Sequence, residues 1–197
     1  MLFFKKRAAK KALASPNAAY EYARDVIKGQ WVEAEPIIAQ HVFWALCYAC
    51  DILKSRFPEA EPVIAQYPYW ALWYARDVIK GRWVEAEPVI AQDAHCSYEY
   101  AEKVIKGRFP LAERVFAQDP SWAYHYACGV IKGRWIEAEP AIAKDPYWAY
   151  RYACDVIKGR FPLAEPTFAN DKDADCAQRY YTDIVIGMYK ASPFEYV

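Results

Sequence analysis

The sequence predicts an all-α solenoid of six 26-residue repeats with a cap at each end. One line of sequence, YPYWALWYARDVIKGRWVEAEPVIAQ at residues 67–92, recurs with variations and without gaps from residue 15 to residue 170. Each copy holds two stretches whose apolar residues follow helical spacing. A pair of short helices cannot bury so apolar a face alone, whereas stacked neighbours can, and this favours short antiparallel helix pairs with a continuous core.

Residues 1–14, MLFFKKRAAKKALA, are predicted to form a basic N-terminal cap helix. A repeat array needs a polar outer face on its first member, and this segment ends where the first repeat begins. Its five cations stand without an acidic residue, so the rest of the chain carries net negative charge. The alternative is a basic arm that contacts phosphates or lipid head groups.

The first half of each repeat predicts a helix of about a dozen residues. Position 1 is Asp or Ser before proline in three repeats, which is typical of an N-cap. Position 15 is glycine in five repeats, where we expect a left-handed C-cap. Positions 5, 9, 12 and 13 are apolar throughout apart from Ser97, so we expect them to form the buried face. Position 8 is always Tyr beside an invariant Ala, which indicates a ring filling the gap between close helices.

The second half of each repeat predicts a shorter helix of one to two turns. Its apolar face comprises Trp or Phe at position 17, Ala at 20, Ile or Phe at 24 and Ala at 25. Proline at position 22 in five repeats disfavours a longer uninterrupted helix. Trp and Phe alternate at position 17 from repeat to repeat. Duplication of a repeat pair is the favoured explanation, and different packing of odd and even repeats is the alternative.

Residues 171–197 are predicted to form a degenerate seventh repeat and C-terminal cap. Asp171 and Lys172 act as a two-residue insertion, after which Tyr180, Ile184 and Gly187 fall on positions 8, 12 and 15. Terminal repeats depart from the consensus because one of their faces meets solvent.

Composition bounds the classes of function. The formal net charge is zero, so the whole chain has no general attraction to nucleic acid or anionic membrane. No apolar run approaches the ~20 residues of a spanning helix. Six cysteines with irregular spacing predict free thiols in a reducing compartment, and hence a cytoplasmic protein.

Three charged positions recur. Lys occupies position 14 in all six repeats, Arg occupies position 16 in five, and Glu occupies position 21 in all six. We favour a structural ladder in which Arg pairs with Glu and Lys complements the helix C-terminus. The alternative is a basic ridge that follows a phosphate backbone.

The positions that vary predict the binding surface. Positions 3, 7 and 10 share one face of the first helix, and we call this face the variable stripe. It carries every chemical class, and its large aromatics beside arginine are typical of binding surfaces, although drift or packing between repeats would also give variation. The predicted binding residues are Phe43, Tyr69, Trp73, Arg76, Glu99, His125, Tyr147 and Arg151.

Nothing in the sequence predicts catalysis or a cofactor. It has no phosphate-cradling glycine-rich loop and no nucleophile elbow. A metal site on His125, Cys128 and Cys154 is a weaker alternative, because four converging ligands cannot be assembled and thiols on helices are more often packing residues. We therefore expect no metal, no cofactor and no enzyme.

The string YARDVIKGRWVEAEPVIAQ resembles tandem-repeat proteins of tailed bacteriophages and bacteria, whose consensus is similar to WAYxYAxxVIKGRWPEAEPxIAxDP. The resemblance covers residues 15–170 and raises a viral origin, with the host cytoplasm as its place. We expect a non-catalytic scaffold that binds a protein partner, one version being a phage protein that inhibits or sequesters a host defence factor. The alternative is a nucleic-acid binder that uses the basic ridge and the N-terminal arm. The sequence leaves the oligomeric state open.

Overall fold

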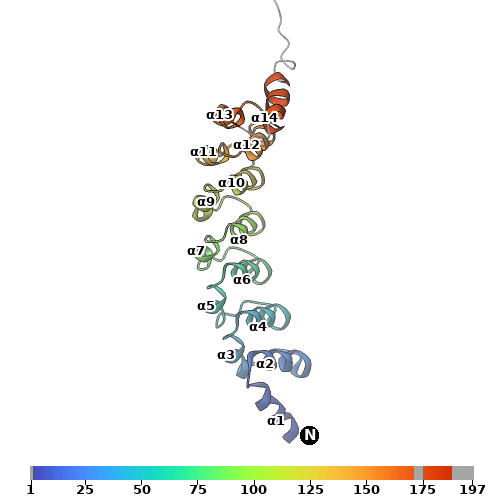
Figure 1. Cartoon of the computed structure of the whole chain (residues 1–197). Helices are drawn as coiled ribbons and strands as arrows, with labels where there is room; N and C mark the ends of the chain where they lie inside the picture. The colour runs from blue at the N-terminus through green and yellow to red at the C-terminus, as the bar shows by residue number, and fades with distance from the viewer. Residues whose placement is uncertain (1, 171–174, 188–197) are drawn as a thin grey trace, which may run out of the picture. The chain divides into compact units, whose positions relative to one another are not determined.

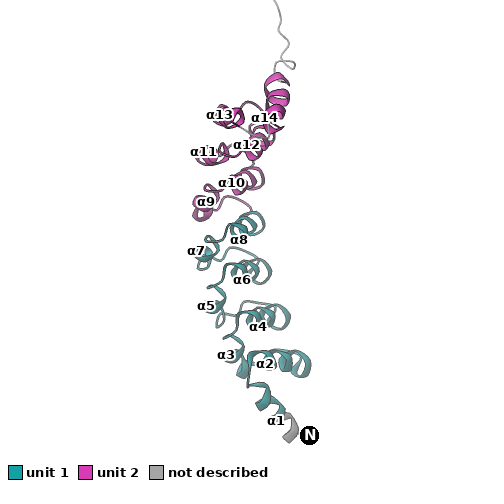
Figure 2. Cartoon of the chain, viewed as in Figure 1, with its two compact units in different colours: residues 1–105 teal, residues 106–197 magenta. Residues whose placement is uncertain are grey.

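The computed structural model describes residues 2–170 and 175–187. Over these ranges the protein is built of helices and turns without a strand, as an α-solenoid-like repeat fold. The chain divides into two compact units, residues 1–105 and residues 106–197 (Figure 2). The division falls inside the fourth repeat.

The first unit holds the N-terminal helix, three whole repeats and the first helix of the fourth. Short π-helical and 3-10 segments are labelled η. Its elements are α1 (Leu2–Ala12), α2 (Pro16–Tyr22), η1 (Ala23–Ile27), η2 (Val32–Ala34), α3 (Glu35–Ile38), α4 (Val42–Cys47), η3 (Tyr48–Leu53), α5 (Glu61–Ile64), α6 (Pro68–Trp73), η4 (Tyr74–Ile79), α7 (Glu87–Ile90), α8 (Ala94–Glu99) and η5 (Tyr100–Ile105).

The second unit holds the rest of the fourth repeat, repeats five and six, and the seventh. Its elements are α9 (Pro110–Phe116), α10 (Pro120–Tyr126), η6 (Ala127–Ile131), η7 (Ile136–Ala138), α11 (Glu139–Ile142), α12 (Pro146–Tyr152), η8 (Ala153–Ile157), η9 (Pro162–Ala164), α13 (Glu165–Ala169), α14 (Asp175–Arg179) and η10 (Tyr180–Ile186).

Each unit is a stack of two layers. In the first unit α2, α4, α6 and α8 form one layer, and α3, α5 and α7 form the other (Figure 1). In the second unit α10, α12 and α14 pack in sequence against one another. The predicted N-terminal helix is present as α1, which packs against α2.

The first helix of every repeat begins as an α-helix and ends as a π-helix. The predicted N-caps form: Ser15, Asp119 and Asp145 each accept a hydrogen bond from a backbone N–H three residues on. Asp93, which precedes alanine, caps α8 in the same way. The π-helical ending, with its wider turn, leaves no signal in the apolar spacing and was not predicted.

The predicted glycine C-cap is wrong by one residue. The left-handed residue is the invariant Lys of position 14, with φ between 52° and 61° in all six repeats, and no described glycine has positive φ. Because the π turn is wide, the Lys28 and Gly29 N–H groups both donate to the Ala23 carbonyl. A Cβ added at Gly29 or Gly81 would meet no atom within 4 Å.

The predicted buried face of the first helix is half right. Alanines at positions 5 and 9, such as Ala71 and Ala75, are fully buried. Positions 12 and 13 are only partly covered, and Val26 is 54% exposed. The π turn rotates these residues away from the face that a regular 3.6-residue helix would give them. The buried face instead uses position 8, whose tyrosines are buried in repeats two to seven.

The second helix is short, as predicted, because proline starts it. Pro36, Pro62 and Pro88 stand in the first turns of α3, α5 and α7, where a proline sacrifices no helical hydrogen bond. The fourth repeat has Arg114 at this position, and its helix α9 runs for 7 residues instead of 4 or 5. The aromatic of position 17 is buried in every repeat, whether Trp or Phe.

The seventh repeat is offset by two residues. The Tyr hydroxyl of one repeat bonds the backbone N–H of position 17 in the preceding repeat at a separation of 17 residues, but the Phe161–Tyr180 bond spans 19. Asp171 and Lys172 themselves, and the tail 188–197, lie outside the described residues.

Candidate functional site

The variable stripe lies on the outer face of the first helices, as its spacing predicts. Phe43, Tyr69 and Tyr147 expose 40%, 46% and 48% of their surface. His95 and His125 are also exposed, whereas Trp73, Arg76 and Arg151 are half-buried. The α-helical start of each first helix places positions 3 and 7 on one side, one turn apart.

Four aromatic side chains of repeats two and three form one surface cluster in residues 1–105. We call Phe43, Tyr69, Trp70 and Trp73 the aromatic cluster. Trp70 lies at its centre, with ring centroids 5.9 Å from Phe43, 5.3 Å from Tyr69 and 6.4 Å from Trp73. Tyr69 and Trp73 are 5.2 Å apart. Edge-to-face rings at these distances hold one another in place.

Arg76 covers one end of the aromatic cluster. Its guanidinium lies 5.2 Å from the Trp73 ring centroid, and its Nε and Nη2 donate to the two Asp77 carboxylate oxygens at 2.8 Å. This carboxylate raises the pKa of Arg76, so the guanidinium stays charged. Stacking and a forked ion pair together fix a side chain that would otherwise be mobile.

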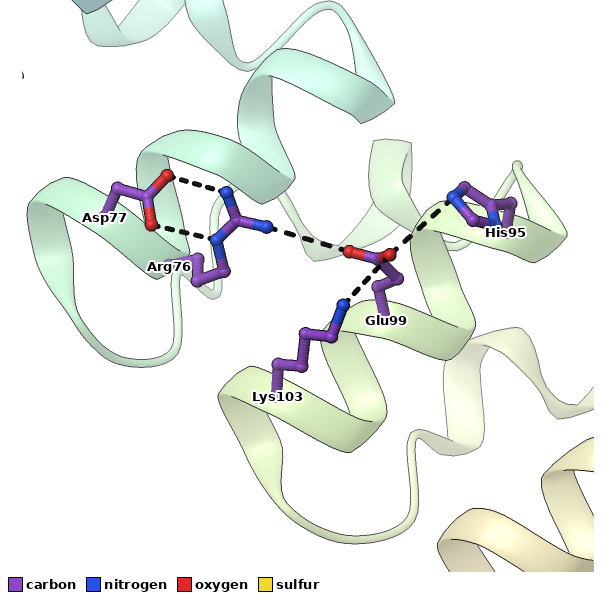
Figure 3. A network of polar contacts seen from close by, with 5 residues as sticks. All are labelled: Arg76, Asp77, His95, Glu99 and Lys103. Atoms are coloured by element: carbon purple, nitrogen blue, oxygen red, sulfur yellow. Dashed lines mark hydrogen bonds and ion pairs between the residues drawn. The ribbon is translucent and has the colours of Figure 1, made fainter.

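A network of charges continues from Arg76 to repeat four (Figure 3). Arg76 Nη1 lies 3.7 Å from Glu99 Oε2. Glu99 Oε1 lies 3.0 Å from Lys103 Nζ and 3.8 Å from His95 Nε2. Five of the eight predicted residues, Phe43 through Glu99, therefore belong to one continuous surface in the first unit.

The other three predicted residues meet in the second unit. His125 and Tyr147 both contact Trp148, with ring centroids 5.3 Å and 4.8 Å away. The Arg151 guanidinium lies 5.5 Å from the Tyr124 ring centroid, and its Nη2 donates to the Tyr124 hydroxyl at 3.0 Å. This surface repeats the chemistry of the first one, with aromatics beside a stacked arginine.

Residues that the sequence analysis missed hold both surfaces together. Trp70 and Trp148 stand at position 4, which is Trp in four of the six repeats. That recurrence beside a variable position was a usable signal. Tyr20 and Tyr124, at position 6, donate to Asp51 and Asp155 of the following repeats at 2.6 Å and 2.5 Å. This Tyr–Asp contact between repeats could not be predicted from the sequence, because the two partners are 31 residues apart.

The recurrent charges form the predicted Arg–Glu ladder. Arg56, Arg82, Arg108 and Arg134 each place Nε and Nη2 on the two oxygens of the Glu five residues on, at 2.8–2.9 Å. Arg160 binds Glu165 similarly, and Gln30 replaces the arginine in repeat one. The position 14 lysines are exposed and pair with no acid among the described residues.

Cys47, Cys50, Cys96, Cys128 and Cys154 are free thiols. Burial raises the pKa of Cys128 and Cys154 above the ordinary value, so both carry their protons at neutral pH. No group of three or more His, Cys, Asp or Glu within the described ranges is arranged to hold a metal ion.

Comparison with known proteins adds no family: no family model, no curated protein and no solved structure matches the chain. Among the described helices none is long and apolar enough to cross a membrane.

Proposed function

We propose that this protein is a non-catalytic scaffold that binds a protein partner through the variable stripe, centred on the aromatic cluster and Arg76. The observation that carries the proposal is the continuity of that surface. Aromatic side chains from two repeats lie against one another, Phe43 and Tyr69 expose 40% and 46% of their surface, and a fixed arginine stands at one end. Trp, Tyr and Arg are the residues that dominate binding energy in protein interfaces.

The surface is organised before any partner arrives. Rings in mutual contact and an arginine paired with Asp77 lose little conformational freedom on binding. The Arg–Glu pairs, together with bonds from the position 8 tyrosines to the same glutamates, such as Tyr74 to Glu61 at 2.9 Å, hold the supporting helices and leave the stripe free to differ between repeats. The proposed place of action is the cytoplasm, and the resemblance to phage repeat proteins favours a host protein, such as a defence factor, as the partner.

The test compares partner capture by the wild-type chain and by Tyr69→Ala/Trp73→Ala. A partner identified by pull-down from host lysate is purified, and its affinity for each chain is measured by calorimetry. We expect the double variant to weaken binding by about thirtyfold or more, because two hot-spot truncations cost at least ~2 kcal/mol together. Tyr67→Ala removes an equally exposed tyrosine that lies off the stripe and serves as the control. Unchanged binding by the double variant would overturn the proposal.

Nucleic-acid binding is the second candidate, and the position 14 lysines favour it. The position 21 glutamates of repeats two to six pair with Arg, and no position 14 Lys forms an ion pair with an acid of the described residues. A nucleic-acid binder would show affinity for a short duplex that falls steeply with added salt. Lys28→Gln/Lys54→Gln/Lys80→Gln should then reduce both the affinity and the slope. Absence of binding at low salt would eliminate this candidate.

A further inference from the structure

An open cavity of about 640 Å³ lies between the first helices of repeats five and six, within residues 106–197. It sits beside the π-helical ends of these helices. Its volume falls in the range of ~300–1,000 Å³ that small-molecule sites occupy. The lining residues are Tyr124, Cys128, Lys132, Gly133, Arg151, Asp155, Val156 and Lys158.

One wall of the cavity is a fixed polar triad. The Tyr124 hydroxyl donates to Asp155 Oδ2, Arg151 Nε donates to the same oxygen at 3.0 Å, and Arg151 Nη2 donates to the Tyr124 hydroxyl. The Tyr124 and Arg151 bonds hold the pKa of Asp155 below its usual value, so it remains a carboxylate. Its negative charge is therefore offset by Arg151.

The remaining charges of the cavity are positive. Lys132 and Lys158 line it and form no ion pair with an acid of the described residues. Their backbones are left-handed, with φ of 57° and 54°, a conformation that costs a residue with a Cβ and that glycine would adopt freely. Lys132 and Lys158 nevertheless adopt this conformation, whereas Gly133 and Gly159, which follow them, do not.

We propose that this cavity binds the phosphoryl group of a small molecule, with Lys132 and Lys158 supplying charge and Arg151 a planar donor. Lysine and arginine around a concave wall are the usual means of phosphate recognition. The volume of about 640 Å³, lined by side chains of two repeats, suits a small ligand rather than a polymer. The cavity shares Arg151 with the variable stripe but contains no residue of the aromatic cluster proposed to bind a protein partner.

The test is calorimetric titration of the full chain with pyrophosphate at low ionic strength, where screening is weak. We expect Lys132→Gln and Lys158→Gln each to weaken binding at least about tenfold, as expected for losing a charge-assisted contact. Lys80→Gln changes the same position of repeat three, outside the cavity, and should leave the affinity unchanged. Lys132→Arg and Lys158→Arg keep the charge and should retain most of the binding, which separates ligand contact from loss of folding.

Three results would overturn the proposal. The first is the absence of pyrophosphate binding by the wild-type chain. The second is equal weakening by Lys80→Gln, which would indicate general attraction to the Lys row. The third is binding of a short oligonucleotide by a chain that ignores pyrophosphate, which would support the nucleic-acid candidate instead. Because none of these measurements involves Tyr69 or Trp73, failure here leaves the protein-binding proposal standing.

Discussion

At the scale of single residues, the tyrosine of position 8 bonds each repeat to the one before it. The Tyr100 hydroxyl accepts a hydrogen bond from the Trp83 backbone N–H at 2.7 Å and donates to Glu87 Oε1 at 3.1 Å. The same pair of bonds recurs wherever one repeat follows another. A buried hydroxyl that satisfies a backbone donor and a carboxylate of the neighbouring repeat fixes how the two repeats pack.

Tyr100→Phe should lower the free energy of unfolding by about 1–3 kcal/mol, because the buried Trp83 N–H loses its acceptor. Urea unfolding followed by circular dichroism measures the loss. Tyr69→Phe removes a hydroxyl from the exposed stripe and should change stability by less than about 0.5 kcal/mol. Equal effects of the two substitutions would show that Tyr100 stabilises the fold through its ring and that its hydroxyl contributes nothing.

The need for the tyrosine hydroxyl, and not only for its ring, could have been predicted from the sequence. Position 17 exchanges Trp and Phe freely, and both kinds of ring sit 5.0–5.4 Å from the tyrosine of their own repeat. Position 8 never becomes Phe. Position 8 keeps Tyr in every copy, whereas position 17, whose ring it contacts, accepts either Trp or Phe. This difference indicates that position 8 needs its hydroxyl. What could not be predicted was the partner, because it lies in another repeat.

At the scale of elements, the starts of the helices were predicted correctly and the end of the first helix was not. Capping residues and proline act locally, so the start of both helices could be predicted from a few neighbouring residues. The π turn depends on how the end of the helix packs in three dimensions, and it moved the left-handed residue from Gly81 to Lys80. It also exposed positions 12 and 13, whose apolar character had predicted burial.

The fourth repeat permits a test of the proline rule. Arg114→Pro should cost little, less than about 1 kcal/mol, because five other repeats place proline there and begin a short helix with it. We expect α9 to shorten to the length of α7. Ala123→Pro, in the middle of α10, should cost about 3 kcal/mol or more, since the Ala123 N–H donates to the Asp119 carbonyl.

Thermal unfolding of both proline variants measures the difference. A large loss for Arg114→Pro would mean that the fourth repeat needs its continuous helix, which would give it a packing role distinct from its neighbours.

At the scale of the whole molecule, the repeated ion pairs and tyrosines set a pH window. Arginine hydrogen bonds lower the pKa of Glu61, Glu87 and Glu113 below 4.5. Their contribution to stability is complete above that value and is lost as the pH falls through the folded pKa. Burial raises the pKa of Tyr48, Tyr100 and Tyr126 from 10.0 to about 12. Their contribution is complete below pH 10 and is lost as the pH rises toward 12.

We therefore expect a flat maximum of stability across neutral pH, with losses below about pH 4.5 and above about pH 10. The midpoint of urea unfolding, measured over this range, checks the prediction. Because the pKa is lowered at three glutamates and raised at three tyrosines, the losses should be steeper than one group would give. A midpoint that is unchanged in acid would indicate that the Arg–Glu ladder contributes nothing, as many exposed ion pairs do.

Of the candidate site, sequence periodicity predicted the face and the eight residues on it. It could not predict which of them meet, because contacts such as Arg76 to Glu99 join different repeats. Nor could it predict the cavity beside Arg151, whose walls come from two repeats and whose lysines belong to the invariant set rather than the variable one.

The tyrosine bond has a direction: each repeat supplies the hydroxyl that its predecessor needs. The degenerate last repeat therefore keeps Tyr180, which serves Phe161 and Glu165, although much of its surroundings has diverged. Any internal copy brings its own donor and its own acceptor, so a gene that gains or loses one 26-residue block still encodes a chain in which every junction is complete. The number of repeats, and with it the length of the variable stripe, is open to change by recombination without loss of the tyrosine bond at any junction.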